Sequence, residues 1–404
     1  MIIGKTHFSP LPPVDYKNIH TGNDDMRCSD YKNESCLYLN EDQFLETYLT
    51  NDMIKQVGNH VANSSETPFF VHLSFVSPHP PSTPPHPWNE FYSDDDISSL
   101  DLNYEVGDID KLPNQTKMLL GITEENPAVN SRASAWLNDD GSPNMEKINQ
   151  DRKLYYDLCA YVDSQIGRAV DFIDSLGIAS ETLIIFTSDH GSQLYDHGID
   201  NDKHTFLDAS WRVPLIMRQP GAVPAGGVER FASTLDVTTT ILAAAGVIIS
   251  EDEGITWDAA NSTSYFMSGF DMYTPLVEKG IGNQPRLAVP GTEYRGYAVV
   301  TGKYKLAYYT EQDETFLWDR VNDVQERENL AKDEKYSEVI NVLRTALLRW
   351  RAQQDDLQWQ MEGWKNAAEV GIRARDDAAK LTGLKAEINL QNAGVLADSI
   401  EIGV

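Results

Sequence analysis

Apolar residues recur at steps of three or four between positions 154 and 173, which is the spacing of one face of an amphipathic helix. These positions are Leu154, Leu158, Val162, Ile166, Val170 and Ile173. The pattern ends at Leu176-Gly177, and a glycine directly after the last apolar position is typical of a helix end. A mostly apolar run, 182–186, follows and is typical of a buried strand in a parallel sheet. Helix, glycine and strand in this order predict an αβ unit of an α/β fold.

Shorter apolar runs predict further strands and a second helix. The run 69–76 predicts a strand that leads into a proline-rich loop, and 213–217 predicts another short strand. Nearer the C-terminus, 297–301 and 305–309 predict two antiparallel strands joined by a turn at Gly302-Lys303. A closing helix is indicated by apolar positions at helical spacing, Leu343, Leu347 and Trp350.

These elements predict a large domain followed by a smaller one. We expect residues 1–279 to form the main α/β domain, and 287–357 to form a smaller α+β subdomain with an antiparallel sheet and a helix. Residues 82–146 are rich in Pro, Asn, Ser and Asp and predict a long loop insertion that faces the substrate. Residues 280–286 predict a linker, and the tail 358–404 has no predicted role.

Composition and charge narrow the class of protein. The chain has 404 residues, of which 41% are hydrophobic, enough to bury a substantial core. Its formal net charge of −29 argues against nucleic acid or an anionic membrane as a partner, because both bind basic surfaces. No apolar run approaches membrane-spanning length, so we expect no membrane insertion. The three cysteines lack paired spacing and predict neither a disulfide framework nor a zinc site.

A carboxylate and an imidazole, Asp189 and His190, come just after the apolar run 182–186. The carboxyl ends of strands are where open α/β sheets place their ligands. Carboxylate oxygens and imidazole nitrogens both bind metal ions. A turn in which Asp189 caps a helix and His190 is incidental would explain the five residues Thr187-Ser188-Asp189-His190-Gly191 equally well. Other segments must therefore decide between a turn and a metal site.

Three further segments carry ammonium or imidazole groups next to predicted strands. Lys5 and His7 are two residues apart after a short apolar start, so a strand would place both on one face. His79 lies between two prolines, which restrict the backbone on either side of it. Lys203 precedes the strand 213–217. Each residue alone is typical of an ordinary surface or loop position, but together they predict an anion-binding site.

In this order the motifs resemble those of the sulfatase family, which belongs to the alkaline-phosphatase-like superfamily. Gly4-Lys5-Thr6-His7 resembles the family's GK-x-H motif, and 74–81 resembles its S-F-x-x-P-H-x-P strand end. Residues 186–191, followed by Lys203, are similar to its metal-and-lysine stretch. The resemblance continues to about residue 350 through 155–167, 235–242 with Thr239 in place of a proline, and 316–330 with Val324 in place of a proline.

The resemblance implies an alkaline-phosphatase-like fold, with a mixed, mainly parallel sheet flanked by helices. It also implies hydrolysis of a sulfate ester of a small molecule or a carbohydrate. That reaction places negative charge on sulfate oxygens, which ammonium groups and a metal ion stabilise. His7 is implied to act as a base on a formylglycine nucleophile, and His79 to act as the acid for the leaving oxygen. The residues implied to hold the sulfate are Lys5, His79 and Lys203.

By the same resemblance, Asp189 and His190 are ligands of a divalent metal ion, which would be calcium. Many relatives have Asn where this chain has His190, so manganese and magnesium stay open as alternatives. The resemblance is compatible with a periplasmic or secreted protein and also with a cytoplasmic one. The oligomeric state stays open.

The nucleophile motif of the family does not occur in these 404 residues. Family members carry an Asp-Asp metal pair and C-x-P-S-R or S-x-P-S-R upstream of GK-x-H, and the Cys or Ser becomes formylglycine. Cys28, Cys36 and Cys159 all lack this context. We therefore expect an N-terminally truncated sulfatase that shows no turnover as it stands. We also expect an unpaired edge beside the strand at 1–4, which would favour aggregation.

Two alternative functions fit the same residues. The first is a phosphonate monoester or phosphodiester hydrolase of the same superfamily, which would use the same lysines and histidines and a manganese ion. The second is a non-catalytic relative that binds an anion or a glycan. Activity ratios on aryl sulfate and aryl phosphonate would separate the two hydrolases.

Overall fold

The structure is a computed structural model. It describes residues 2–4, 16–17 and 40–360, except for 65, 124–134, 139, 201, 228–230, 247–254, 257–263, 266–268, 270, 280–287 and 294–295. The chain forms two compact units, each built from separate segments. Unit 1 comprises Met1–Val106, Asn126–Thr182 and Leu194–Asn201, and unit 2 comprises Gly107–Glu125, Leu183–Gln193 and Asp202–Val404.

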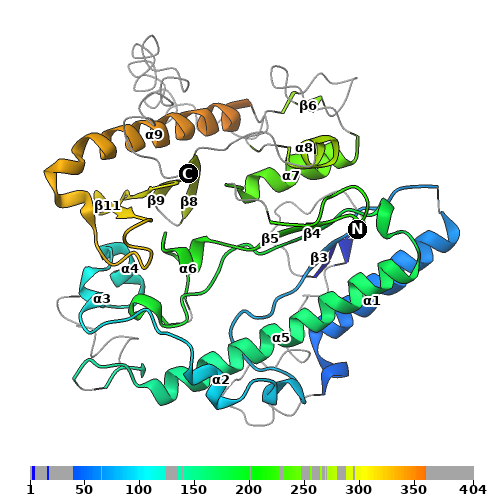
Figure 1. The fold of residues 1–404 in the computed structure, drawn as a ribbon, viewed down its shortest axis with the longest axis horizontal. Helices are drawn as coiled ribbons and strands as arrows, with labels where there is room; N and C mark the ends of the chain where they lie inside the picture. Colours follow the sequence, from blue (N-terminus) through cyan, green and yellow to red (C-terminus); the bar gives the residue numbers. More distant parts are fainter. Residues whose placement is uncertain are drawn as a thin grey trace. The chain divides into compact units, whose positions relative to one another are not determined.

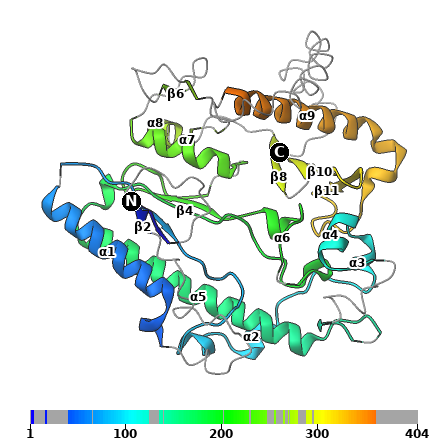
Figure 2. The same cartoon turned by 180° about the vertical axis from the view of Figure 1, so that it is seen from behind.

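Two long helices of unit 1, α1 (Leu45–Asn63) and α5 (Met145–Ser175), lie side by side (Figures 1 and 2). The predicted helix at 154–173 is therefore confirmed and begins earlier than its apolar pattern. It is followed by Gly177, whose φ of 71° is in the left-handed region that glycine tolerates best. Phe44 and Tyr161 pack edge to face with ring centroids 5.2 Å apart, which joins the start of α1 to the middle of α5.

A three-stranded parallel sheet also belongs to unit 1. Its order is β2 (Tyr16–Lys17), β1 (Ile2–Gly4) and β3 (His72–Ser74). Strand β1 has a partner on both sides, so the unpaired edge expected beside it was a wrong prediction. Gly4 pairs with Ser74, so the motifs that begin at these two residues start at paired positions of neighbouring strands.

The region 82–146, predicted as a long loop, contains several short helices. Unit 1 holds η4 (Trp88–Glu90) and α2 (Asp94–Ser98), and unit 2 holds α3 (Asp108–Lys111) and α4 (Asn114–Leu119). Helix α2 begins with a capping box, in which Ser93 accepts a bond from the Asp96 amide at 3.1 Å and donates its own amide to Asp96 at 2.9 Å. The remaining single turns of unit 1 are η3 (Glu41–Gln43), η7 (Ala179–Glu181) and η8 (Asp196–Gly198).

In unit 2, β4 (Ile184–Thr187) pairs antiparallel with β5 (Leu215–Arg218). The apolar run 182–186 was predicted as a buried parallel strand, and both the direction and the full burial were wrong. An apolar run fixes the strand but not its direction, which depends on the partner that the connecting segment brings alongside. The other elements before the C-terminal sheet are α6 (Asp208–Trp211), α7 (Thr234–Ala244), β6 (Ile255–Thr256), β7 (Ser264–Tyr265) and α8 (Tyr273–Lys279).

The C-terminal part of unit 2 is a four-stranded antiparallel sheet covered by a helix. The order is β11 (Glu314–Asp319), β10 (Tyr304–Tyr309), β9 (Gly296–Thr301) and β8 (Ala288–Glu293). After the single turns η9 (Leu330–Lys332) and η10 (Glu334–Tyr336), helix α9 (Ser337–Gln360) runs along the sheet (Figure 1). The predicted hairpin and closing helix are thus confirmed. Their shared core contains Val299, Leu306, Leu317, Leu343 and Leu347.

Side chains of the late motif at 316–330 form hydrogen bonds to the backbone around the end of β11. Asn329 accepts a bond from the Leu317 amide at 3.0 Å and donates to the Thr315 carbonyl at 3.2 Å. Asp319 caps the following turn by accepting bonds from the amides of Val321 and Asn322, both at 3.0 Å. The motif therefore fixes the segment that follows β11.

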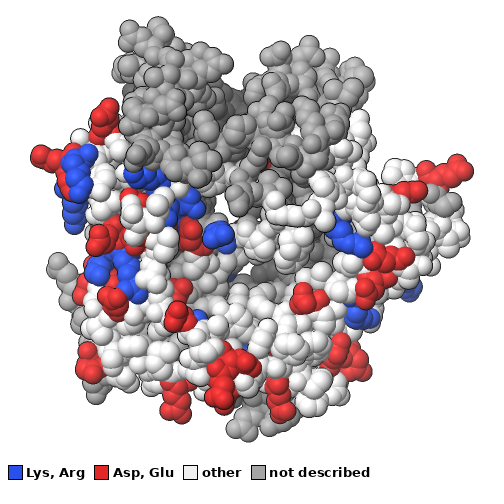
Figure 3. All heavy atoms as spheres, viewed as in Figure 1, with Lys and Arg blue, Asp and Glu red and all other residues white. Residues whose placement is uncertain are grey.

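Acidic side chains are spread over the visible surface in Figure 3, and over α3, α4 and α9 basic side chains alternate with them. In the part of the chain that the structure describes, no helix combines the length and apolarity needed to cross a membrane.

Candidate active site

The turn after β4 places the predicted metal ligands side by side. The Ser188 hydroxyl donates to the His190 carbonyl at 2.8 Å, and the Asp189 carboxylate accepts a bond from the His190 amide at 2.9 Å. His190 Nε2 lies 3.4 Å from Asp189 Oδ2. The other ring nitrogen, Nδ1, is 2.9 Å from the Gly191 carbonyl, which can only accept, so Nδ1 carries a hydrogen. Nε2 is thus the ring nitrogen that faces the carboxylate.

This pair fits part of a metal site. The Asp189 side chain is 79% exposed and the His190 side chain 35%, so both donors can be reached from solvent. Calcium takes six to eight oxygen ligands, whereas magnesium and manganese also accept nitrogen in smaller sets. Among the described residues, no group of three or more His, Cys, Asp or Glu side chains could hold a metal ion. Asp189 and His190 would thus be two ligands of a larger set.

The segment that carries Lys203 is tied to this turn by backbone hydrogen bonds within unit 2. The Gly191 amide donates to the Ser210 carbonyl at 2.7 Å, and the Gln193 amide donates to the Asp202 carbonyl at 3.0 Å. Asp202 also accepts a bond from the amide of Lys203 at 2.7 Å. These bonds hold the half-buried Lys203 in the segment that runs beside the metal turn.

A completely buried lysine, Lys305 of β10, holds the chain just beyond Lys203. Its ammonium donates to the Phe206 carbonyl at 2.7 Å and to Asp208 at 2.5 Å, and it also pairs with Glu326. Burial opposes ionisation of Asp208, but the ammonium outweighs it and holds the pKa of Asp208 below its ordinary value. Burial raises the pKa of Glu326, which stands in the same cluster.

His79 lies in an exposed turn of unit 1. Its amide donates to the Val76 carbonyl at 3.1 Å, and its Nδ1 is 2.7 Å from the Pro80 carbonyl. The base of the turn is buried, since Val76 and Ser77 are each only 6% exposed. The Ser77 amide donates to the carboxylate of Glu46 at 2.9 Å.

Glu46 is a residue that the sequence prediction missed. It is fully buried on α1, and a signal for it was present in the sequence. Leu49, Met53 and Val57 follow at helical spacing, so Glu46 occupies a position on the buried face where an apolar residue would be ordinary.

The predicted site residues are thus distributed over both units. Asp189, His190 and Lys203 belong to unit 2, and His79 belongs to unit 1. Lys5 and His7 lie outside the described residues. Convergence of all six residues in one cleft therefore stays a prediction.

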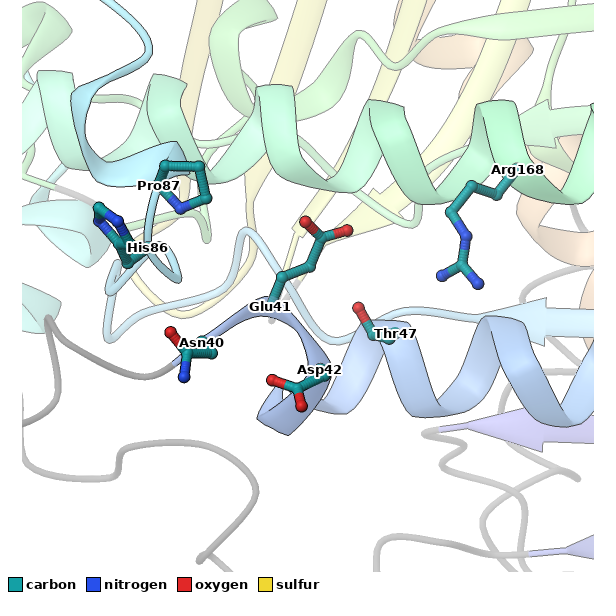
Figure 4. A pocket seen from close by; sticks show the side chains of 7 residues that line it. All are labelled: Asn40, Glu41, Asp42, Thr47, His86, Pro87 and Arg168. Carbon is teal, nitrogen blue, oxygen red and sulfur yellow. The ribbon is translucent and has the colours of Figure 1, made fainter.

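Unit 1 has a shallow pocket of about 460 Å³ that contains none of these residues (Figure 4). It is lined by Asn40, Glu41, Asp42, Thr47, His86, Pro87 and Arg168. Glu41 accepts bonds from Trp88 at 3.2 Å and Gln165 at 3.1 Å, and Arg168 donates to Gln165 at 2.7 Å. Glu41 and Arg168 are thus engaged by neighbouring side chains, and we assign the pocket no ligand.

Comparison with known proteins identifies the family. Residues 2–247 match the protein family described as Sulfatase. This chain belongs to the sulfatase family. The sulfatase chain is 27% identical to the choline-sulfatase of Rhizobium meliloti (strain 1021) over 323 residues, which are 79% of this chain and 56% of that protein. It is 25% identical to an arylsulfatase of Clostridium perfringens (strain 13 / Type A) over 307 residues, which are 74% of this chain and 55% of that protein.

This sulfatase spans about half the length of these curated relatives. Among solved structures it is similar to the phosphonate monoester hydrolase of Agrobacterium radiobacter. The TM-score is 0.63 and the identity 24%, with 82% of this chain and 66% of the other covered. That similarity confirms the predicted α/β fold of the alkaline-phosphatase-like kind.

Proposed function

We propose that this sulfatase-family hydrolase cleaves sulfate esters of small molecules or carbohydrates with the help of a divalent metal ion. The observation that carries the proposal is the turn after β4. There a carboxylate and an imidazole nitrogen face each other 3.4 Å apart, beside the segment that carries Lys203. Family membership supports a hydrolase, and the names of the sulfatase relatives support sulfate as the anion.

Each of the predicted site residues would have its own role in the reaction. Asp189 and His190 would hold the metal ion, with calcium the expected ion, and a bound cation would draw charge from the sulfate oxygens. Lys203 would place an ammonium against the same oxygens. His79, exposed at its turn, would contact the sulfate and give a proton to the leaving oxygen. Lys5 and His7 keep their predicted roles as sulfate ligand and base.

Phosphonate monoester hydrolysis is the second candidate function. It is favoured by the fold similarity to a phosphonate monoester hydrolase and by His190, a ligand that suits manganese better than calcium. Because we expect no turnover from the chain as it stands, titration with inorganic sulfate and with methylphosphonate, each in the presence of calcium and of manganese, would separate the two functions.

Calorimetric titration with calcium and with manganese tests the metal proposal without needing turnover. We expect Asp189→Asn to weaken binding about tenfold or more, because a carboxylate ligand is lost. Asp171→Asn, at an exposed position of α5, is the matched control and should leave affinity unchanged. Lys203→Ala should weaken binding of inorganic sulfate while metal affinity stays as in the parent chain. Equal metal affinity in Asp189→Asn and Asp171→Asn would contradict the proposed site.

A further inference from the structure

Glu46 is a buried carboxylate for which the proposed chemistry has no use. Its side chain is completely inaccessible, in the first turn of α1. One oxygen, Oε1, accepts the Ser77 amide at 2.9 Å. The other, Oε2, has no hydrogen-bond partner among the described residues, and neither has the buried hydroxyl of Ser77. Burial of a carboxylate is costly unless it is paired, so an apolar residue would suit a purely structural role better.

The group that Glu46 binds is the base of the turn that presents His79. Val76 and Ser77 are buried, whereas His79 is exposed. The His79 amide closes the turn on the Val76 carbonyl at 3.1 Å. A bond to Ser77 therefore fixes one side of a turn whose other side carries the imidazole.

The first turn of α1 is itself anchored, which makes Glu46 a fixed point. Thr47 donates its amide to the Tyr161 hydroxyl at 3.0 Å, and the two hydroxyls are 2.8 Å apart. Tyr161 of α5 is completely buried, and burial raises the pKa of its hydroxyl, which keeps its proton. The Tyr161 hydroxyl thus accepts the Thr47 amide and shares a second hydrogen bond with the Thr47 hydroxyl. A continuous set of contacts thus runs from α5 through α1 to the His79 turn, all within unit 1.

We propose that Glu46 is a positioning residue for His79: its carboxylate holds the Ser77 amide and thereby fixes the direction in which the imidazole is presented. The statement that Glu46 holds the turn rests on contacts alone. The statement that this serves the reaction rests on the proposed function.

Amide hydrogen exchange measured by NMR on the whole chain tests the first statement. Because Glu46→Ala removes a hydrogen bond to a charged acceptor, exchange of the Ser77 amide should become about tenfold faster or more. Glu46→Gln keeps an acceptor oxygen of the same reach and should restore the parent rate to within about threefold. Leu49→Ala is the matched control, because Leu49 is also fully buried on α1 but has no acceptor atom for the Ser77 amide. It should lower the melting temperature without changing the Ser77 rate relative to the other α1 amides.

Two outcomes would overturn the proposal: an unchanged Ser77 rate in Glu46→Ala, or a Glu46→Gln variant as fast as Glu46→Ala. If Glu46→Ala does not fold, Glu46→Asp keeps the charge but is one methylene shorter, and an unchanged Ser77 rate there would count against the proposal in the same way.

Two measurements separate this proposal from the proposed function: the NMR signal of the His79 ring, and the affinity for inorganic sulfate. Glu46→Ala should broaden and shift the His79 ring signal and should weaken sulfate binding by the factor seen in His79→Ala. The double variant should bind no worse than either single variant, because both changes remove the same contact. If His79→Ala leaves sulfate binding unchanged, the proposed role of His79 fails while the exchange rates still decide whether Glu46 holds the turn.

Discussion

Position 191 has no space for a side chain. A Cβ atom added to Gly191 would lie 2.0 Å from the Ala209 carbonyl oxygen, while the Gly191 amide is bonded to the next carbonyl, that of Ser210. Backbone atoms cannot give way as a side-chain tip can, so Gly191→Ala must displace either the Asp189-His190 turn or the segment after Lys203. We expect a loss of about 1–3 kcal/mol of stability, the usual cost of overpacking, and weaker metal binding, measured by thermal melting and by calcium titration.

Gly227→Ala is the control for this change. A Cβ atom at Gly227 would meet nothing within 4 Å, and the residue is exposed. Its melting temperature and metal affinity should match those of the parent chain. Parent-like metal affinity in Gly191→Ala would show that the contact with Ala209 does not position the ligands.

At the scale of single residues, the sequence could propose Asp189, His190, Lys203 and His79 as site residues because each stands next to a predicted strand or a proline-framed turn, and their shared role stays a prediction. Glu46 and Lys305 could not be assigned in the same way. Their partners lie far along the chain, Ser77 for Glu46 and Phe206, Asp208 and Glu326 for Lys305. A buried ionised group is recognised only when the fold brings its partner to it.

At the scale of elements, Lys305 ties the C-terminal sheet to α6. Lys305→Met would remove the ammonium partner of the buried Glu326 carboxylate and of the half-buried Asp208 carboxylate. Removal of one partner from a buried ionic cluster costs about 3–5 kcal/mol, so we expect a large fall in melting temperature at neutral pH. Lys335→Met is the matched control, because Lys335 pairs with Asp333 at 2.7 Å but its side chain is 65% exposed. That variant should melt close to the parent chain.

The destabilisation by Lys305→Met should depend on pH, and its direction can be worked out. Without Lys305, burial would raise the pKa of Glu326 further above its unfolded value of about 4. An acid with a raised pKa in the folded state gains relative stability as the pH falls towards its unfolded pKa. The gap in melting temperature between the parent and Lys305→Met should therefore narrow from pH 7 to pH 5. A gap that is constant or widens over this range would show that lost packing, and not uncompensated charge, causes the destabilisation.

Elements with a long local pattern were predictable, and those that depend on a distant partner were not. Helix α5 and the hairpin β9–β10 follow directly from apolar spacing and a Gly-Lys turn. Helix α2 has five residues, too few for a periodic pattern, and is recognised chiefly by its capping serine, Ser93. The direction of β4 is set by β5, which the sequence does not reveal as its neighbour.

At the scale of the whole molecule, the two units do not follow the order of the chain. Unit 2 contains Leu183–Gln193 as well as Asp202–Val404, so the segment with the predicted metal ligands belongs to the same unit as the C-terminal sheet. The predicted domain boundaries, with a division near 280–286, used the order of predicted elements and the composition of the segment between them. Composition marks where a chain is rich in turn-forming residues, but a compact unit is defined by contacts that can join segments far apart in sequence.

The contacts within unit 2 predict that the C-terminal segment 287–360 will not fold alone. Phe206 packs against Tyr309 with ring centroids 5.3 Å apart, and it lies so close to Gly296 that a Cβ atom there would be 2.8 Å from its ring. Expressed by itself, the segment would expose this face of the sheet and leave Lys305 without Asp208 and the Phe206 carbonyl. The loss of these contacts is large relative to a net stability of about 5–15 kcal/mol for a whole domain.

We therefore expect residues 287–360 alone to lack near-ultraviolet circular dichroism and to unfold in urea without a sharp transition. The complete chain, measured under the same conditions, is the reference. A sharp transition and the near-ultraviolet signal of a packed core in the isolated segment would mean that the four strands and α9 supply enough buried surface among themselves. Lys305 would then join two independently stable parts, and Lys305→Met should weaken their association without lowering the melting temperature of the C-terminal sheet.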